Sequence, residues 1–149
     1  MLQPGDEFPD FELQDQNDET VRRVDLLGSR SIVYFYPKDD TSGCTMEACD
    51  FRDRLPKFSG AKVVGVSPDS VKSHAKFVKK FELNFTLLAD PERKLIEPLG
   101  LWVEKVLYGK KYMGVARTTF LLDEKGKVIQ VWEKVKPEGH AEEVLAAIQ

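Results

Sequence analysis

The chain has 149 residues and a mass of 17.0 kDa, a length typical of one domain, so we expect residues 1–149 to form a single domain. Hydrophobic residues make up 42% and charged residues 32%, which excludes the composition of a disordered chain. The net charge of −3 argues against a general nucleic-acid-binding protein, which normally has a basic excess. The longest apolar run, Ile32–Tyr36, is far too short to cross a membrane. The N-terminus has no secretory pattern, and we expect a cytoplasmic protein.

The first third of the chain predicts a hairpin, a buried strand and a helix. Residues 11–13 and 20–24 are short strands around a polar turn, which predicts an N-terminal β-hairpin. The continuous β-branched and aromatic run Ser31–Tyr36 predicts a strand buried on both faces. Apolar residues then recur every three or four positions between Cys44 and Phe58, which predicts a helix.

The rest of the chain continues the alternation of strands and helices. Strands are predicted at 61–66, 85–88, 117–122 and 128–132, and helices at 71–81, 90–99 and 137–149. Residues 105–114 contain scattered glycines, lysines and tyrosines, and we expect a long loop there. The early alternation favours parallel pairing and the late hairpin favours antiparallel pairing. The order therefore predicts an α/β fold with a mixed central sheet and helices on both faces.

Only two cysteines occur, Cys44 and Cys49. Two cysteines in a chain of this length are not a disulfide scaffold. In a reducing compartment a close pair is more often catalytic, redox-sensing or metal-binding. A structural zinc site needs four ligands, and neither His74 nor His140 lies at ligand spacing from the pair. We therefore expect no metal, and each histidine fits a surface or core position better.

Cys44 lies at the junction between the predicted strand 31–36 and the start of the predicted helix. Ligands of open α/β sheets bind at such ends. The free backbone N–H groups and the dipole of a helix N-terminus favour an anion, and here they favour the thiolate, the reactive form of cysteine. Position alone makes Cys44 a candidate nucleophile. The alternative, a small buried hydrophobic residue, is common for a single cysteine and stays open on this evidence.

The spacing of Cys44 and Cys49 restricts how they can be joined. In an intact helix, residues five apart have Cα atoms roughly 8.6 Å from each other. A disulfide requires less than about 7 Å. A permanent bond between Cys44 and Cys49 is therefore a poor hypothesis, whereas a transient bond with local unwinding of the helix is consistent with the spacing.

Three segments resemble one family. Pro37-x-x-x-Thr41-x-x-Cys44 matches the active-site pattern of the peroxiredoxins, and Gly43-Cys44-Thr45-x-Glu47-Ala48-Cys49 is similar to their bacterioferritin comigratory protein (PrxQ) subfamily. Arg117-Thr118-Thr119-Phe120 resembles the arginine-bearing strand of that family. The resemblance extends over nearly the whole chain and implies a thioredoxin-like fold. Ser42 departs from the pattern, since the subfamily usually has proline there, and the change puts the rigidity of this loop in doubt without removing a catalytic atom.

The resemblance also implies roles for particular residues. Cys44 is the expected peroxidatic thiol, which attacks a peroxide oxygen and becomes a sulfenic acid. The Thr41 hydroxyl is expected to position the peroxide. Arg117 is expected to stabilise the thiolate and the charge on the leaving oxygen. Supporting positions complete the site, with Glu47 orienting Arg117 and with Pro37 and Gly43 shaping the pocket.

Cys49 resembles the resolving thiol, which condenses with the sulfenic acid to an intramolecular disulfide that thioredoxin or a similar dithiol reduces. The resemblance implies hydrogen peroxide and organic hydroperoxides as substrates, no cofactor, no membrane partner and a monomer, although Leu101 and Trp102, if exposed, would offer a dimer surface. One alternative is a peroxide-responsive redox sensor that uses the same reversible Cys44–Cys49 disulfide. A thioredoxin-type oxidoreductase is disfavoured because it needs C-x-x-C, and a binding domain with inert thiols is the simplest alternative.

Overall fold

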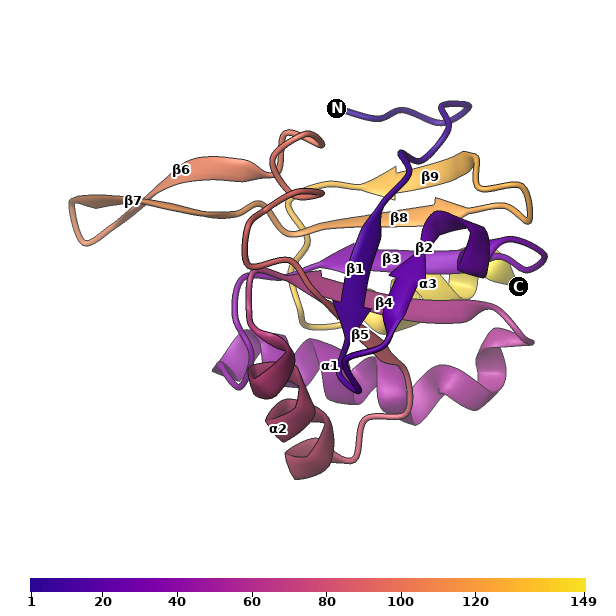
Figure 1. Ribbon diagram of the computed structural model, residues 1–149, viewed down its shortest axis with the longest axis horizontal. Coiled ribbons are helices and arrows are strands. Elements are labelled where there is room, and N and C mark those ends of the chain that lie inside the picture. The colour runs from indigo at the N-terminus through magenta and orange to yellow at the C-terminus, as the bar shows by residue number, and fades with distance from the viewer.

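The computed structural model describes residues 1–149. Seven strands form one mixed sheet in the order β2-β1-β5-β4-β3-β8-β9 (Figure 1). Strands β3, β4 and β5 are parallel, and every other pairing in this sheet is antiparallel. The mixed sheet is thus confirmed, and the N-terminal hairpin extends it at one edge. The strands are β1 (Glu12–Asp15), β2 (Thr20–Arg22), β3 (Ser31–Phe35), β4 (Lys62–Ser67), β5 (Thr86–Ala89), β8 (Thr118–Leu122) and β9 (Val128–Trp132).

Three α-helices accompany the sheet: α1 (Ser42–Arg54), α2 (Val71–Phe81) and α3 (His140–Ile148). Pro56 follows α1 and the chain continues as a 3-10 helix, η2 (Leu55–Phe58), so the predicted helix is present with a change of pitch near its end. The Ser70 hydroxyl caps α2 by accepting from the Ser73 N–H at 3.1 Å. A second 3-10 helix, η1 (Arg23–Leu26), follows β2.

The sheet separates two hydrophobic cores. On one face, buried side chains of α1, α2 and α3, including Phe51, Phe77 and Val144, pack against β3 and β4. On the other face the cover is the N-terminal segment, η1 and the turns that follow β5, which contribute Phe8, Leu26 and residues near Ile96. Helices flank the sheet as predicted, but the buried apolar residues of all three α-helices belong to one core. The predicted sheet flanked by helices is thus confirmed, with the three α-helices over one face and the 3-10 helix η1 over the other.

The predicted helix at 90–99 is a series of turns, and this explains the helix missing from the second face. The Asp90 carboxylate accepts from the backbone N–H groups of residues 94, 95 and 96, between 2.7 and 3.0 Å. Arg93 has a φ of 57°, which is incompatible with a right-handed helix. Its guanidinium lies over the Trp102 ring at 4.5 Å, which favours the turn over the helix.

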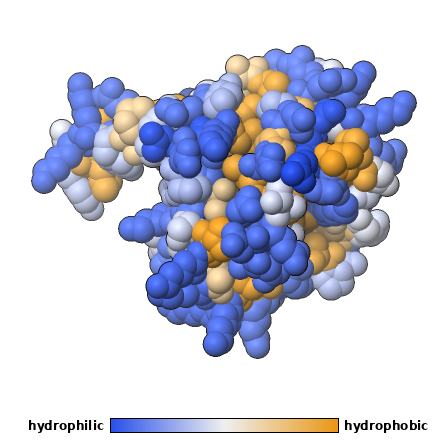
Figure 2. Space-filling view, viewed as in Figure 1, coloured by the Kyte–Doolittle hydropathy of each residue, from blue (hydrophilic) through white to orange (hydrophobic).

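The predicted loop at 105–114 is instead a two-stranded arm, with β6 (Trp102–Leu107) paired to β7 (Lys110–Val115). Tyr108 and Gly109 make its turn with φ values of 51° and 77°, as a tight hairpin requires. The arm projects from the body, and Figures 1 and 2 show that few other elements cover it. Because neither face of the outer arm is buried, its sequence lacks the alternation that identifies a strand.

Leu101 is completely buried and Trp102 is half-buried, so Leu101 cannot contribute to a dimer surface. The exposed large apolar side chains near them lie on the arm instead, at Val106, Leu107 and Tyr108. None of the helices combines the length and the apolar character that a membrane span needs.

Candidate active site

The site lies where β3 ends and α1 begins, because the chain turns sharply after the buried strand. Pro37 directly follows the strand region and is half-buried. Thr41 is the N-cap residue of α1, and Cys44 is the third residue of the helix. The Cys44 side chain is only 1% exposed. The predicted location of Cys44 in the first helical turn is confirmed, and the sulfur is shielded from bulk water.

Arg117 comes to Cys44 from the residue before β8, 73 positions further along the chain. Its Nη2 group donates to Cys44 Sγ at 3.0 Å. Its Nη1 group donates to Glu47 Oε1 at 3.1 Å. One planar guanidinium therefore contacts both the sulfur and a carboxyl group, which needs the fixed fork of donors that arginine has and lysine lacks. The structure brings together Cys44, Glu47 and Arg117, as the resemblance implies.

Glu47 is one turn of α1 beyond Cys44 and is 1% exposed. Burial raises the pKa of this carboxyl group from 4.5 to about 7, and the Arg117 charge opposes that rise. When Glu47 is ionised it shares the Arg117 charge with the sulfur. When it is protonated, the guanidinium charge faces Cys44 without a competing anion.

Lys105, on β6 of the arm, is a second cation near this site, and sequence reasoning missed it. Burial and the Arg117 charge both lower the pKa of Lys105, whereas Cys44 opposes the shift. Lys105 and Arg117 line the same surface cavity of about 480 Å³, with Val103 and Val135 on its apolar side. No sequence signal separated Lys105 from the other lysines of its segment, because the segment resembled a loop.

Thr41 closes the start of α1 but does not contact the sulfur through its side chain. Its hydroxyl donates to the Lys38 carbonyl at 2.9 Å, and its own carbonyl accepts from the Thr45 N–H at 2.8 Å. Ser42, the first residue of α1, is exposed. Its position is one where proline is well tolerated, which accounts for the family's usual choice.

Gly43 lies directly under Arg117. A Cβ atom on Gly43 would lie 3.2 Å from Arg117 Nη2 and 3.2 Å from Pro137 Cγ. A side chain at this position would therefore compete with the guanidinium for space. The absence of a Cβ allows Arg117 to approach the helix closely enough to reach Cys44 Sγ.

Cys49 lies on the same helix and is partly exposed, and both thiols are free. Burial raises the pKa of the Cys49 thiol above its ordinary value, while Arg52 opposes the rise. Since both cysteines belong to one intact helix, their ideal Cα separation of roughly 8.6 Å is too large for a disulfide. Joining them requires α1 to unwind locally.

Two comparisons with known proteins agree with this geometry. Residues 4–131 match the family model described as the AhpC/TSA family. The chain is 46% identical over 150 residues to peroxiredoxin Bcp of Bacillus subtilis, an alignment that covers 99% of this chain and 96% of that protein.

The chain belongs to the AhpC/TSA family. Its relatives are Bcp/PrxQ peroxiredoxins, which are thiol-dependent peroxidases, and this protein is such an enzyme. Solved peroxiredoxin structures also match the fold. A cysteine-to-serine mutant of Xylella fastidiosa PrxQ aligns with a TM-score of 0.93 and 34% identity, covering 99% of this chain and 96% of that one. Xanthomonas campestris bacterioferritin comigratory protein aligns with a TM-score of 0.87 and 43% identity, covering 93% and 89%. The thioredoxin-like fold is confirmed.

The histidines of this peroxiredoxin hydrogen-bond to groups other than the two thiols. His140 is buried against Phe51 and Trp132 and contacts Thr119 Oγ1 at 2.8 Å. Both histidines lie beside carboxylates: His140 Nδ1 is 3.0 Å from Glu143 Oε1, and Asp39, Asp69 and His74 offer ligand atoms within 4.8 Å of one another. These atoms already hydrogen-bond within the protein, as described below, and they make a structural network rather than an open metal site. Sequence reasoning treated His74 as a core or surface residue and missed this pairing.

Proposed function

We propose that this peroxiredoxin reduces hydrogen peroxide and organic hydroperoxides through a Cys44 sulfenic acid that Cys49 resolves within the same chain. The observation that carries the proposal is the 3.0 Å contact between Arg117 Nη2 and Cys44 Sγ at the start of a helix. A cation and a helix N-terminus both favour the thiolate.

In the first step the Cys44 thiolate attacks one peroxide oxygen and the O–O bond breaks. The sulfur is oxidised to the sulfenic acid, and the other oxygen leaves as water or an alcohol after taking up a proton. Arg117 donates hydrogen bonds and therefore stabilises negative charge on the sulfur and on the leaving oxygen. Glu47 orients Arg117 through the second arm of the guanidinium. Gly43 leaves room for that approach, Pro37 shields the entry to the loop, and we assign Thr41 to positioning the peroxide as α1 adjusts.

In the second step α1 unwinds, and the Cys49 thiol attacks the sulfenic sulfur. The S–S bond forms and the oxygen leaves as water. Thiol–disulfide exchange with an external dithiol then restores both thiols. We propose a thioredoxin-like reductant, a monomer that completes the cycle alone as a single domain over residues 1–149, and a cytoplasmic location. The partial exposure of Cys49 and its place on the same helix support a cycle within one chain. The alkyl peroxide reduction named for the Xanthomonas campestris relative supports organic substrates.

The test is peroxide consumption by the reduced protein with thioredoxin and its reductase as the electron source. Cys44→Ser should abolish turnover, and activity that survives this change would refute the assignment. Cys49→Ser should keep one rapid oxidation of Cys44 but lose the intramolecular disulfide in mass spectra of the peroxide-treated chain. An oxidation that occurs once and does not turn over with any dithiol would favour a redox sensor instead. Size-exclusion chromatography with light scattering checks the monomer.

A further inference from the structure

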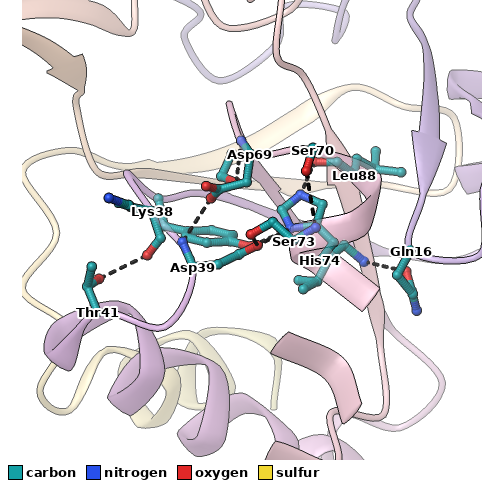
Figure 3. Close-up of polar contacts among 12 residues, drawn as sticks. Gln16, Lys38, Asp39, Thr41, Asp69, Ser70, Ser73, His74 and Leu88 are labelled. Atoms are coloured by element: carbon teal, nitrogen blue, oxygen red, sulfur yellow. Dashed lines mark hydrogen bonds and ion pairs between the residues drawn. The ribbon is translucent and has the colours of Figure 1, made fainter. Parts of the chain in front are cut away.

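The loop that carries Cys44 is tied to the rest of the protein by a buried polar network that the chemistry above does not use. Its centre is Asp39, five residues before Cys44 and 7% exposed, and its partner His74, on α2, is completely buried. Figure 3 shows the loop and α2 facing each other across these contacts. Buried polar groups of this kind persist only when they are well paired.

Both carboxylate oxygens of Asp39 are engaged. Oδ1 accepts from the Tyr36 hydroxyl at 2.6 Å. Oδ2 accepts from the Ser73 hydroxyl at 2.8 Å and lies 2.7 Å from His74 Nδ1. The backbone N–H of Asp39 donates to Asp69 Oδ2 at 2.8 Å. One residue of the loop is therefore bound to Tyr36 just after β3, to α2 and to the segment after β4.

His74 must carry a hydrogen on Nε2. That nitrogen lies 2.9 Å from the Leu88 carbonyl oxygen, which can only accept. The other nitrogen, Nδ1, faces Asp39 Oδ2, which already accepts from Ser73. One further proton is therefore held between Nδ1 and Oδ2, which makes this contact a charge-assisted hydrogen bond. The ring bridges β5 and the loop and cannot shift without breaking a bond at each nitrogen.

The network is connected to Cys44 by a short chain of contacts. Thr41 donates its hydroxyl back to Lys38, beside Asp39, and its carbonyl accepts the first hydrogen bond of α1 from Thr45. The first turn of α1 thus begins from a loop that is fixed at Asp39 through its side chain and its backbone N–H. Cys44 lies inside that turn, so the turn cannot unwind freely while the loop stays bound.

We propose that Asp39 and His74 are positioning residues that hold the first turn of α1 helical and thereby set how the Cys44 sulfenic acid divides between two fates. One is condensation with the Cys49 thiol, which forms the disulfide and releases water. The other is attack on a second peroxide, which gives the sulfinic acid and releases water or an alcohol. The first needs unwinding and the second does not, so a stronger hold favours overoxidation. This inference rests on the proposed function.

The test compares Asp39→Asn and His74→Gln with Asp40→Asn, a matched control. Asp40 is the next residue of the same loop, and it is exposed and paired only with Lys80 on the surface.

Rapid mixing with hydrogen peroxide separates Cys44 oxidation from disulfide formation, and mass spectrometry measures the sulfinic fraction. If the unwound form is a minor population, its increase speeds disulfide formation in proportion but hardly depletes the folded form. We expect disulfide formation about tenfold faster and the sulfinic fraction about tenfold lower in the network variants, a ratio that corresponds to roughly 1.4 kcal/mol. Cys44 oxidation should change by less than about twofold, and the control should match the wild type.

Hydrogen exchange of the unaltered protein gives a second measurement that needs no stable variant. The amide of Asp39 and the amide of Thr45 should both be protected in the reduced protein and should both exchange faster in the disulfide form. An Asp39 amide that stays protected while Thr45 loses protection would show that the network is not coupled to the helix start and would overturn the proposal. So would network variants that behave like Asp40→Asn. A wild type that consumes no peroxide defeats the proposed function instead, and the exchange experiment tells these failures apart.

Discussion

Two buried carboxyl groups lie on either side of Cys44, and they differ in how completely they are paired. Asp39, before the cysteine, has hydrogen-bond partners on both oxygens, from Tyr36, Ser73 and His74. Glu47, after the cysteine, is bound through one oxygen to Arg117. The pKa of Glu47 is raised to about 7 because burial outweighs the attraction of that one cation.

The different pairing of Asp39 and Glu47 corresponds to two different effects on their surroundings. A carboxylate with several donors from separate elements fixes the backbone that carries it. A carboxyl group that binds one arm of a guanidinium leaves the other arm free to contact a second atom, and here the second atom is Cys44 Sγ. A carboxyl group therefore anchors the loop on one side of Cys44, and on the other side a carboxyl group binds the arginine that contacts the sulfur.

The largest expected effect comes from removing the cation on the Glu47 side. Arg117→Ala deletes the donor to the sulfur, and losses of one such donor in other enzymes suggest a fall in kcat/KM for peroxide of about 10²- to 10³-fold. Arg117→Lys keeps the charge without the fork and should recover only part of the rate. The exposed Arg22, paired with Glu12 on the surface, is the control, and Arg22→Ala should leave the rate unchanged. A near-normal rate for Arg117→Ala would show that the contact is structural.

The pH dependence of stability isolates Glu47. The folded chain binds this proton more tightly than the unfolded chain, because the pKa is about 7 in the fold against 4.5 in the unfolded reference. The contribution is fully favourable below about pH 4.5 and is lost as the pH rises through about 7. A difference of about 2.5 pH units corresponds to about 3 kcal/mol of unfolding free energy.

Urea unfolding between pH 4.5 and 8 measures this loss. Glu47→Gln cannot ionise, so its unfolding free energy should lack the decline, and the difference between the two proteins should grow across that range. Parallel curves for the wild type and Glu47→Gln would contradict the buried, proton-binding carboxyl group.

A smaller effect on activity is expected when the space between Gly43 and Arg117 is filled. Gly43→Ala places a Cβ 3.2 Å from Arg117 Nη2, so the guanidinium must move by a few tenths of an ångström. We expect kcat/KM to fall about tenfold, since positioning errors of this kind weaken catalysis. Stability should stay equal or rise by up to about 1 kcal/mol, because alanine favours a helix over glycine. Ser42→Ala, in the same turn but exposed, should change neither quantity, and a Gly43→Ala variant with normal activity would show that Arg117 adapts without cost.

The smallest effect on stability is expected at the surface pair of Asp40 and Lys80, next to the buried pair of Asp39 and His74. Lys80 pairs with Asp40 at 2.7 Å, but both side chains are about half exposed. Lys80→Ala should change the unfolding free energy by less than about 0.5 kcal/mol, as measured for other surface ion pairs. His74→Ala breaks a buried pair and should cost roughly 3 kcal/mol or more. Similar costs for both variants, measured by urea unfolding, would remove the distinction between the two tethers.

The residues around Glu47 and Cys44 could be predicted from the sequence, whereas the network around Asp39 could not. Cys44, Glu47 and Cys49 lie within six positions, where helical spacing relates them directly, and the resemblance supplied Arg117. Asp39 and His74 are 35 residues apart. Their pairing depends on the parallel register of β3, β4 and β5, which no local pattern specifies.

The two wrong elements failed for local reasons. Asp90 and Pro91 carry the signals of a helix start, but the Asp90 side chain bonds three successive amides within turns and so competes with the helix. The arm gave the opposite error, because a strand exposed on both faces shows no hydrophobic period to detect.

The arm leaves the body and returns to it at almost one point. The Ala116 N–H donates to the Leu101 carbonyl at 2.8 Å, so the two ends of the excursion are already joined across its base. The main sheet therefore places no constraint on the length of the arm. Insertions, deletions and substitutions at its tip can accumulate without disturbing the rest of the fold. Only the inner part of the arm, where Lys105 lies beside Gly114, is close enough to Arg117 and Cys44 to interact with them electrostatically.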